Sequence, residues 1–277
     1  MKLKIMVVLI AVLAAWMIGH KHKSGGASME HKSGDAPMVA SMTNGQDEIR
    51  RSFKLTAGAT VELRGINGSV EIETADSDNA EIHIKRTAAS REDLERERIV
   101  VEESADKLSI YGQKGDGSWW DNFTGARVRN EVKLRLPRRI ELMTKGINGP
   151  VKIGEVDGAV RLEGINGGAE LAQSNGFTEA MGINGSVSLG LARLTGEGLK
   201  VKGVNGRVEI RLAKDIDADV NVKGLNGSVS FDVPNVSEQE KTRSSVRARI
   251  GAGGSPISVT GVNGGVHITS VSAADNR

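Results

Sequence analysis

The sequence predicts an all-β protein: a single-stranded parallel β-solenoid with an N-terminal β-rich cap that contains one short helix. Three observations predict this fold. A Gly-(Ile/Val/Leu)-Asn-Gly unit recurs along the chain, short stretches of alternating apolar and polar residues follow it, and aromatic residues make up only 3% of the 277 residues. A fixed short period is typical of repeat architectures, in which each unit packs only on its neighbours. Abundant aliphatic residues with few aromatic ones suit a thin core built in layers.

The repeating unit is about nine residues long, close to half of the 18-residue step between strong copies. The Asn positions 148, 166, 184, 205 and 226 are separated by 18, 18, 21 and 21 residues, and the next lies 37 residues further on, about two periods. Weaker copies at Asp157-Gly158 and Asn175-Gly176 fall halfway between strong ones. The strong copies carry Asn67, Asn148, Asn166, Asn184, Asn205, Asn226 and Asn263.

Each unit has the same internal logic, illustrated by the copy at residues 182–189. The Asn-Gly pair predicts a tight corner, because Gly and often Asn accept a positive φ. Val187 and Leu189 then share one face of a short strand, and Ile183 before the Asn adds a third core residue. If the coils stack in register, the Asn amides, which both donate and accept, form a ladder along the axis.

An antiparallel sheet is the structural alternative, because Asn-Gly between apolar runs is also a strong hairpin signal. Three features favour stacked parallel coils instead. The turns recur at constant spacing, the strands are only three or four residues long, and the copies resemble one another more closely than the arms of a hairpin need to.

The N-terminus predicts export. Lys2 and Lys4 precede an uncharged apolar run of 15 residues, from 5 to 19. This length fits a signal-peptide core and is short for a membrane span, which takes roughly 20 residues. A cleaved signal peptide and an uncleaved signal-anchor that attaches the chain to a membrane both remain open. Residues 20–46 then read as a disordered linker, in which His20, His22 and His31 are solvated rather than metal-binding.

Residues 47–143 read as an N-terminal β cap with the first coils. Strands are expected over 47–90, 98–103 and 107–112, and His83 is expected on an outward strand face. Ser90 is an N-cap candidate for a helix over 90–97. Residues 144–270 carry the solenoid repeats, interrupted by an excursion at 233–256, and 271–277 form a tail.

Two segments outside the repeat are candidate contact surfaces. Trp119 and Trp120 lie in a Gly- and Asp-rich loop and form either a binding contact or a lid over the open end of the first coil. The strand that follows places basic residues on one face, either as a plain solvated surface or as a contact for an anionic envelope polymer or lipid. Its basic residues are Arg127, Arg129, Lys133 and Arg135.

Three features together resemble a known family. They are the Gly-(Ile/Val/Leu)-Asn-Gly-x-Val-x-(Ile/Leu) units, the Leu-Pro-Arg-Arg-Ile-Glu-Leu stretch at 136–142, and the Gly-Ala-Gly-Gly-Ser-Pro-Ile-Ser-Val-Thr-Gly stretch at 251–261. Over about residues 50–270 the chain resembles the bacterial putative-adhesin family of unknown function, which carries GIN-type β-strand repeats. The resemblance implies a β-solenoid that is exported or attached to the envelope, with no established enzyme activity.

The sequence gives less support to other classes of function. A formal charge of +2, from 37 basic and 35 acidic residues, gives no footprint for nucleic acid, and the absence of Cys excludes thiolate metal sites. A carbohydrate-active β-helix enzyme would need two carboxylates, and Glu170 and Glu209 are expected two coils apart, roughly 9–10 Å. A calcium-binding β-roll would need Asp at the turns, where only Asp157 is acidic. The expectation is a non-enzymatic adhesin or scaffold without a cofactor, whose partner is an envelope polymer or protein.

Overall fold

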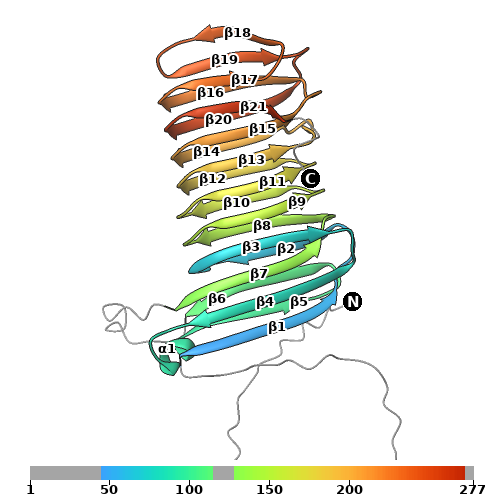
Figure 1. Ribbon diagram of the computed structural model, residues 1–277, viewed down its shortest axis with the longest axis vertical. Helices are drawn as coiled ribbons and strands as arrows, with labels where there is room; N and C mark the ends of the chain where they lie inside the picture. The colour runs from blue at the N-terminus through green and yellow to red at the C-terminus, as the bar shows by residue number, and fades with distance from the viewer. Residues whose placement is uncertain (1–44, 115–127, 272–277) are drawn as a thin grey trace, which may run out of the picture. The chain divides into compact units, whose positions relative to one another are not determined.

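The computed structural model describes residues 45–114 and 128–271. Within these ranges the chain forms 21 β-strands and one short helix, and the strands make two mixed sheets that face each other (Figure 1). The all-β prediction is confirmed. No helix in these two ranges has the length and apolar character needed to cross a membrane. The candidate leader at 5–19 and most of the linker lie outside the described residues.

The order of strands in each sheet departs from their order in the chain. In the described residues, sheet A runs β1 (Gln46–Lys54), β4 (Asn79–Thr87), β7 (Arg129–Pro137), β3 (Gly68–Ala75), β9 (Val151–Val156), β11 (Ala169–Ser174), β13 (Val187–Leu191), β15 (Val208–Ala213), β21 (Val266–Val271) and β17 (Val229–Asp232). Sheet B runs β18 (Val236–Lys241), β19 (Ser245–Ile250), β16 (Ala218–Asn226), β20 (Ser255–Asn263), β14 (Leu199–Asn205), β12 (Thr178–Asn184), β10 (Val160–Ile165), β8 (Ile140–Ile147), β2 (Ala59–Arg64), β6 (Lys107–Lys114) and β5 (Glu97–Glu103).

From β8 to β15 successive strands alternate between the two sheets. Each strand from β8 to β13 pairs in parallel with the strand two places later in the chain, so that β10 lies beside β12 and β11 beside β13. The repeat period sets the register. Ile183 lies opposite Val204, and Val187 lies opposite Val208, each 21 residues away. Corresponding residues of neighbouring repeats are therefore direct neighbours in the sheets.

Antiparallel pairing occurs at both ends of this parallel region. At one end β4 pairs with both β1 and β7, and β5 pairs with β6. At the other end β19 pairs with β16 and β18. The segment 233–256, which the sequence predicts as an excursion, holds the β18–β19 hairpin and extends sheet B beyond β16.

The final repeat occupies an unexpected place. By chain order, the coil that contains Asn263 should stack after the coil that contains Asn226. Instead β20 pairs with both β14 and β16, and β21 pairs with both β15 and β17. The last two strands of the chain, β20 and β21, are thus inserted between the pair β14 and β15 and the pair β16 and β17, which are consecutive in sequence. The 37-residue step reflects the β18–β19 hairpin and the return of the chain into this slot.

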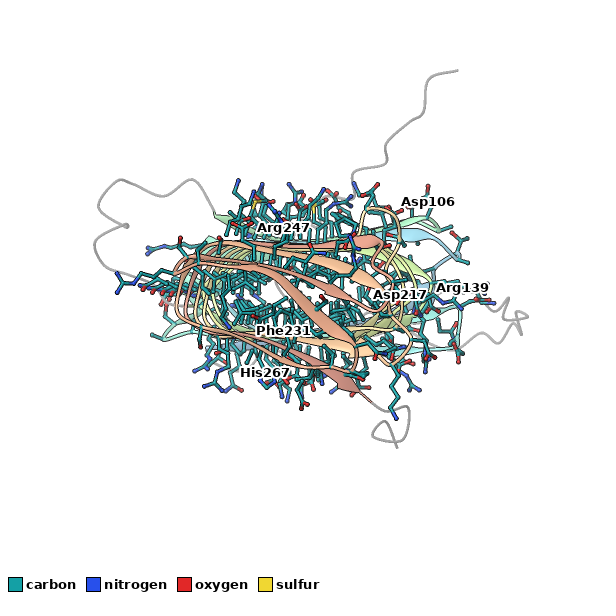
Figure 2. All side chains as sticks on the ribbon, turned by 90° about the horizontal axis from the view of Figure 1, so that it is seen from above. Asp106, Arg139, Asp217, Phe231, Arg247 and His267 are labelled. Carbon is teal, nitrogen blue, oxygen red and sulfur yellow. The ribbon has the colours of Figure 1, made fainter. Side chains whose placement is uncertain are left out.

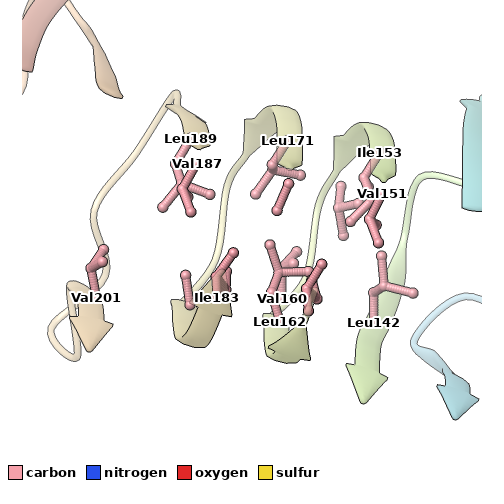
Figure 3. Packing of buried hydrophobic residues seen from close by; sticks show 14 of the residues in the cluster. Leu142, Val151, Ile153, Val160, Leu162, Leu171, Ile183, Val187, Leu189 and Val201 are labelled. Carbon is pink, nitrogen blue, oxygen red and sulfur yellow. The ribbon is translucent and has the colours of Figure 1, made fainter. Parts of the chain in front are cut away.

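The core between the sheets is aliphatic and layered. Ile183, Val187 and Leu189 are each at most 1% exposed, as the repeat predicts. Figure 3 shows Val151 and Ile153 of sheet A pointing toward side chains of sheet B such as Val160 and Leu162. Each strand therefore adds a short row of two or three side chains, and the same row recurs in the next layer.

The two glycines of each repeat serve different needs, illustrated by Gly182 and Gly185. Gly182 has φ 65°, which an L side chain rarely adopts. A Cβ on Gly185 would lie 2.4 Å from the carbonyl oxygen of Gly167 in the neighbouring coil. The sequence suggested that Asn184 also has a positive φ, but it does not. In the described residues Asn235 is the non-Gly residue with a positive φ.

A buried ion pair joins two strands and the helix at the N-terminal end of sheet A. Arg86, 5% exposed, donates to Asp47 Oδ2 at 2.7 Å and to the carbonyl oxygens of Leu94 and Glu97. Those carbonyls belong to the end of α1 (Arg91–Arg96) and the residue after it. Burial raises the pKa of Asp47 and lowers that of Arg86, and their mutual attraction opposes both shifts. The pair thus ties β1 and β4 to the helix.

Helix α1 begins as the sequence predicts. The Ser90 hydroxyl accepts a hydrogen bond from the Asp93 backbone N–H at 3.2 Å, as an N-cap does. Leu94 is the buried residue of the helix, and Arg91 and Glu95 form an exposed i,i+4 ion pair. The charge run around it is a solvated face.

The C-terminal end of the stack combines a short edge strand with a charged hairpin. Phe231 of β17 lies between the two sheets in the view along the stack (Figure 2). On β18, Glu238 lies opposite the buried Ala248, and the register shifts between Glu238 and Glu240. Charges and irregularities of this kind discourage further strands from pairing with an exposed edge.

The glycine at the close contact is expected to be indispensable. Gly185→Ala should destabilise the fold by about 2–5 kcal/mol, because the new Cβ forces the Gly167 carbonyl away. Gly254→Ala is the matched control, since Gly254 also has a positive φ, 140° against 155° for Gly185, and a Cβ there meets nothing within 4 Å. Urea unfolding of both variants measures the difference, and equal midpoints would contradict the close-packing explanation.

The buried pair gives a second stability prediction. Arg86→Ala leaves the Asp47 carboxylate without its ion-pair partner and should cost about 3–5 kcal/mol. The control Arg50→Ala removes an exposed pair with Glu48 and should cost no more than about 1 kcal/mol. Thermal unfolding of the two variants checks the contrast. A loss for Arg86→Ala as small as that of the control would show that the pair does not hold the end together.

Candidate functional site

The seven repeat Asn residues form one continuous column. Each side-chain Nδ2 donates to the Oδ1 of the next Asn, at 2.9–3.1 Å over six bonds. Asn67, at the acceptor end of the column, donates instead to the carbonyl oxygen of Val128 at 2.8 Å. From donor to acceptor the order is Asn226, Asn263, Asn205, Asn184, Asn166, Asn148 and Asn67.

The column binds neighbouring layers to one another at their exposed corner. All six bonds run in the same direction, so each amide between the ends both donates and accepts once within the column. A one-residue slip of any layer between the two ends would break two of these bonds. The column is therefore a structural element, and the size of its contribution to stability stays a prediction.

The predicted contact residues separate into two groups. Arg129, Lys133 and Arg135 lie on β7 with exposed side chains, on the outer face of sheet A. Trp119, Trp120 and Arg127 lie outside the described residues.

Acidic neighbours balance the basic face of β7. The Lys133 ammonium lies 3.1 Å from Glu131 and 3.9 Å from Glu71, and the hydrogen bond with Glu131 raises the pKa of Lys133. In register, Arg135 lies between Glu81 of β4 and Glu73 of β3. The surface therefore carries both charges side by side.

Two polar grooves lie at this end of sheet A. One of about 540 Å³ borders the first residues of β1, β3 and β7 and the last residues of β4. The other, about 580 Å³, follows the middle of β1, β4 and β7, and is lined by Arg50, Arg51, Ser52, Glu71, Glu73, Glu81, Ile82, His83, Lys133, Leu134 and Arg135. Both grooves contain residues of the predicted basic strand.

Side-chain bonds fix the residues between the two grooves. Glu48 accepts from Arg50 at 2.7 Å and pairs with the ring of His83, and these hydrogen bonds lower the pKa of Glu48. His83 is half-buried and lies on the outer face, as predicted. The side chains of this face are therefore held in place by neighbours across the strands.

Three buried polar residues at the first groove were missed by the sequence analysis. Asp47 Oδ1, Arg86 Nε and Asn130 Oδ1 are buried atoms without a hydrogen-bond partner in the structure. Residues Ile82, Ile84 and Arg86 alternate on one strand face, so an Arg stands where the pattern calls for a core residue. An Arg at a core position of the alternating pattern was the feature of the sequence that could have indicated this buried group.

The two carboxylates considered for sugar chemistry lie in the register that the sequence suggested. Ser188 pairs with Glu170 on one side and with Glu209 on the other, which sets the two carboxylates two strands apart, roughly 9.6 Å. Ser188 Oγ lies 3.5 Å from Glu209 Oε2. The row continues in space as Lys152, Glu170, Ser188, Glu209, His267, Ser230, with the last two exchanged relative to chain order.

The acidic corner considered for calcium is bonded to an amide. Asp157 Oδ1 accepts from the Nδ2 of Asn175 in the next layer. In the described residues, no group of three or more His, Cys, Asp or Glu side chains is arranged to hold a metal ion. Asp157 thus takes part in a second, shorter corner contact of the same kind as the Asn column.

Comparisons with known proteins give remote likenesses. No family model matches the chain, and no curated protein matches it significantly. Among solved structures it is similar to a putative cell adhesion protein from Clostridium sporogenes, at 13% identity and TM-score 0.38 over 82% of this chain and all of that one. It is also similar to putative adhesins from Bacteroides fragilis (12%, TM-score 0.29, 81% of this chain and 97% of that one) and Parabacteroides merdae (9%, 0.25, 81% and 96%). Values this low carry no functional argument.

The column gives a stability prediction with an internal control. Asn184→Ala removes two column bonds and should destabilise the fold by about 1–2 kcal/mol. Asn226→Ala removes one bond at the end of the column and should cost about half as much. Chemical denaturation of both variants tests this, and a neutral Asn184→Ala would show that the column adds nothing to stability.

Proposed function

We propose that this chain is a non-enzymatic, exported or envelope-attached protein with an adhesin-like or scaffolding role. In this proposal the parallel region is a β-solenoid-type stack, and the outer face of sheet A contacts a polar polymer or protein of the cell envelope. The observation that carries it is a continuous outward row across sheet A, one residue per strand. In spatial order the row is Arg50, His83, Lys133, Glu71, Lys152, Glu170, Ser188, Glu209, His267 and Ser230.

The geometry of this row suits an extended partner. Neighbouring strands lie about 4.8 Å apart, so ten residues in register span about 40 Å. Every interior strand is hydrogen-bonded on both sides, which holds the row rigid before any partner arrives. A preorganised surface loses little conformational entropy on binding.

The N-terminal end of the face is the strongest contact region. There the outer face is hollowed by the two polar grooves, and donors such as Lys133 and Arg135 alternate with carboxylates such as Glu71 and Glu81. Concave surfaces bury more of a partner than flat ones, and a few placed polar groups set its orientation. The predicted leader supports placing this face outside the cytoplasm.

Solenoid-type stacking is supported by three properties of the parallel region. Strands alternate between sheets, neighbours are related by the sequence period, and one corner carries an uninterrupted Asn column. In such folds each repeat is stabilised by its neighbours, and the outward residues are free to vary. Function then resides in what differs between layers.

A binding experiment tests the proposal. The purified chain is expected to co-sediment with isolated cell-envelope material, and the double variant Lys133→Ala with Arg135→Ala is expected to bind about tenfold more weakly, a change of about 1.4 kcal/mol. Fractionating the envelope into glycan and protein then identifies the partner class.

The matched control lies on the opposite sheet. Lys202→Ala with Lys223→Ala removes two exposed lysines from the outer face of sheet B and should leave binding unchanged. Equal losses for both double variants would point to nonspecific charge attraction. No binding of the parent chain to any envelope fraction would contradict the proposed role.

A further inference from the structure

The Asn-Gly pairs of the repeat are open to a spontaneous reaction of the Asn side chain with the backbone, and the hydrogen bonds of the Asn column oppose it. In any Asn-Gly sequence the backbone nitrogen of the Gly can attack the Asn side-chain carbon, Cγ, because a Gly has no Cβ to obstruct the approach. The new N–C bond closes a five-membered succinimide as the C–Nδ2 bond breaks and ammonia leaves. Water then opens the ring to Asp or isoaspartate. The ring-closing step needs a backbone nitrogen that is free of its own hydrogen bond and a side chain that is able to rotate.

An interior member of the column is held by three hydrogen bonds. Asn184 Nδ2 donates to Asn166 Oδ1 at 3.0 Å, and Asn184 Oδ1 accepts from Asn205 Nδ2 at 3.1 Å. The nucleophile, the Gly185 backbone nitrogen, donates to the carbonyl oxygen of Asn205 at 3.1 Å. All three bonds have to break before the nitrogen reaches Cγ.

Asn226, at the C-terminal end of the column, is held by one hydrogen bond. Asn226 Nδ2 donates to Asn263 Oδ1 at 2.9 Å, but in the described part of the chain nothing donates to Asn226 Oδ1. Within the same ranges the backbone N–H of Gly227 has no hydrogen-bond acceptor either. The column ends at this layer, because the β18–β19 hairpin extends sheet B without adding another Asn-Gly corner.

We propose that Asn226 is a spontaneous modification site, which converts to Asp and isoaspartate while the hydrogen-bonded interior corner at Asn184 is protected. The reaction consumes one water and releases one ammonia per site. It places a carboxylate beside Asn263 Oδ1, where a donor stood before, so the last bond of the column is lost. Isoaspartate also lengthens the backbone by one carbon at the corner that joins β16 to β17. Compared with the corner at Asn184, the modification is thus favoured at the end of the stack.

The chain supplies its own matched control. Asn184 and Asn226 are both followed by Gly-Ser-Val-Ser, and they are preceded by Ile and Leu respectively. In the unfolded chain the two sites therefore have nearly the same intrinsic reactivity. Any difference in the folded chain is due to the structure.

The experiment incubates the full chain in warm, mildly alkaline buffer, folded and in urea, and follows both sites by peptide mass spectrometry with enzymatic detection of isoaspartate. Asn226 should convert several-fold faster than Asn184 when folded, and the two rates should converge in urea. Equal rates in the folded chain, or a faster Asn184, would overturn the proposal.

A second variant tests whether the column sets the rate. Asn263→Ala removes the acceptor for Asn226 Nδ2 and the donor to Asn205 Oδ1. If this variant unfolds at the incubation temperature, the comparison of Asn184 with Asn226 in the parent chain decides alone. If it stays folded, both Asn205 and Asn226 should convert faster than in the parent. Unchanged rates in the folded variant would overturn the assignment of protection to the column.

Discussion

The contact between glycine backbones of successive layers is the constraint on which the rest of this structure depends. At the corner of each repeat the chain passes so close to the next layer that a methyl group does not fit, as the distance from Gly185 to the Gly167 carbonyl shows. That approach brings the Asn side chains within bonding distance and sets the layers at the spacing of parallel strands. The aliphatic rows then meet their counterparts in the next layer as well as the rows of the facing sheet. The glycine corner, the Asn column and the layered core therefore all follow from the same distance between successive layers.

The ends of the stack need a different solution, because there the next layer is missing. At the N-terminal end, antiparallel strands and a short helix take its place, and a buried Arg86–Asp47 pair joins them. At the C-terminal end a hairpin with charged residues continues one sheet. The N-terminal solution places an ion pair at positions where the interior layers have mainly aliphatic residues, with a few buried hydroxyl groups such as those of Thr144 and Ser174. The grooves considered for binding lie at the N-terminal end, because repetition stops there and side chains begin to differ.

Much of the interior was predictable from sequence because it repeats. The inward positions of Ile183, Val187 and Leu189, the pairing of layers 18 or 21 residues apart, and the cap at Ser90 follow from local pattern. Three features did not. Asn was expected to share the positive φ, but at most of the repeat corners the glycines before and after it have the positive φ. Arg86 was hidden by the strand alternation around it. The place of the last coil is a long-range choice among near-identical surfaces, and no local pattern encodes it.

That last choice has a kinetic side. The coils that begin at β14 and β16 are consecutive in the chain and present matching faces, yet in the final structure β20 and β21 separate them. Before residues 255–271 are synthesised, the shortest loop closure brings β16 directly onto β14, and short closures form first. Such a pairing satisfies the same core and the same Asn contact, so it is a competing state of nearly equal local energy. Reaching the native order then requires this premature neighbour to detach, which makes the arrival of the C-terminal segment a candidate slow step in folding.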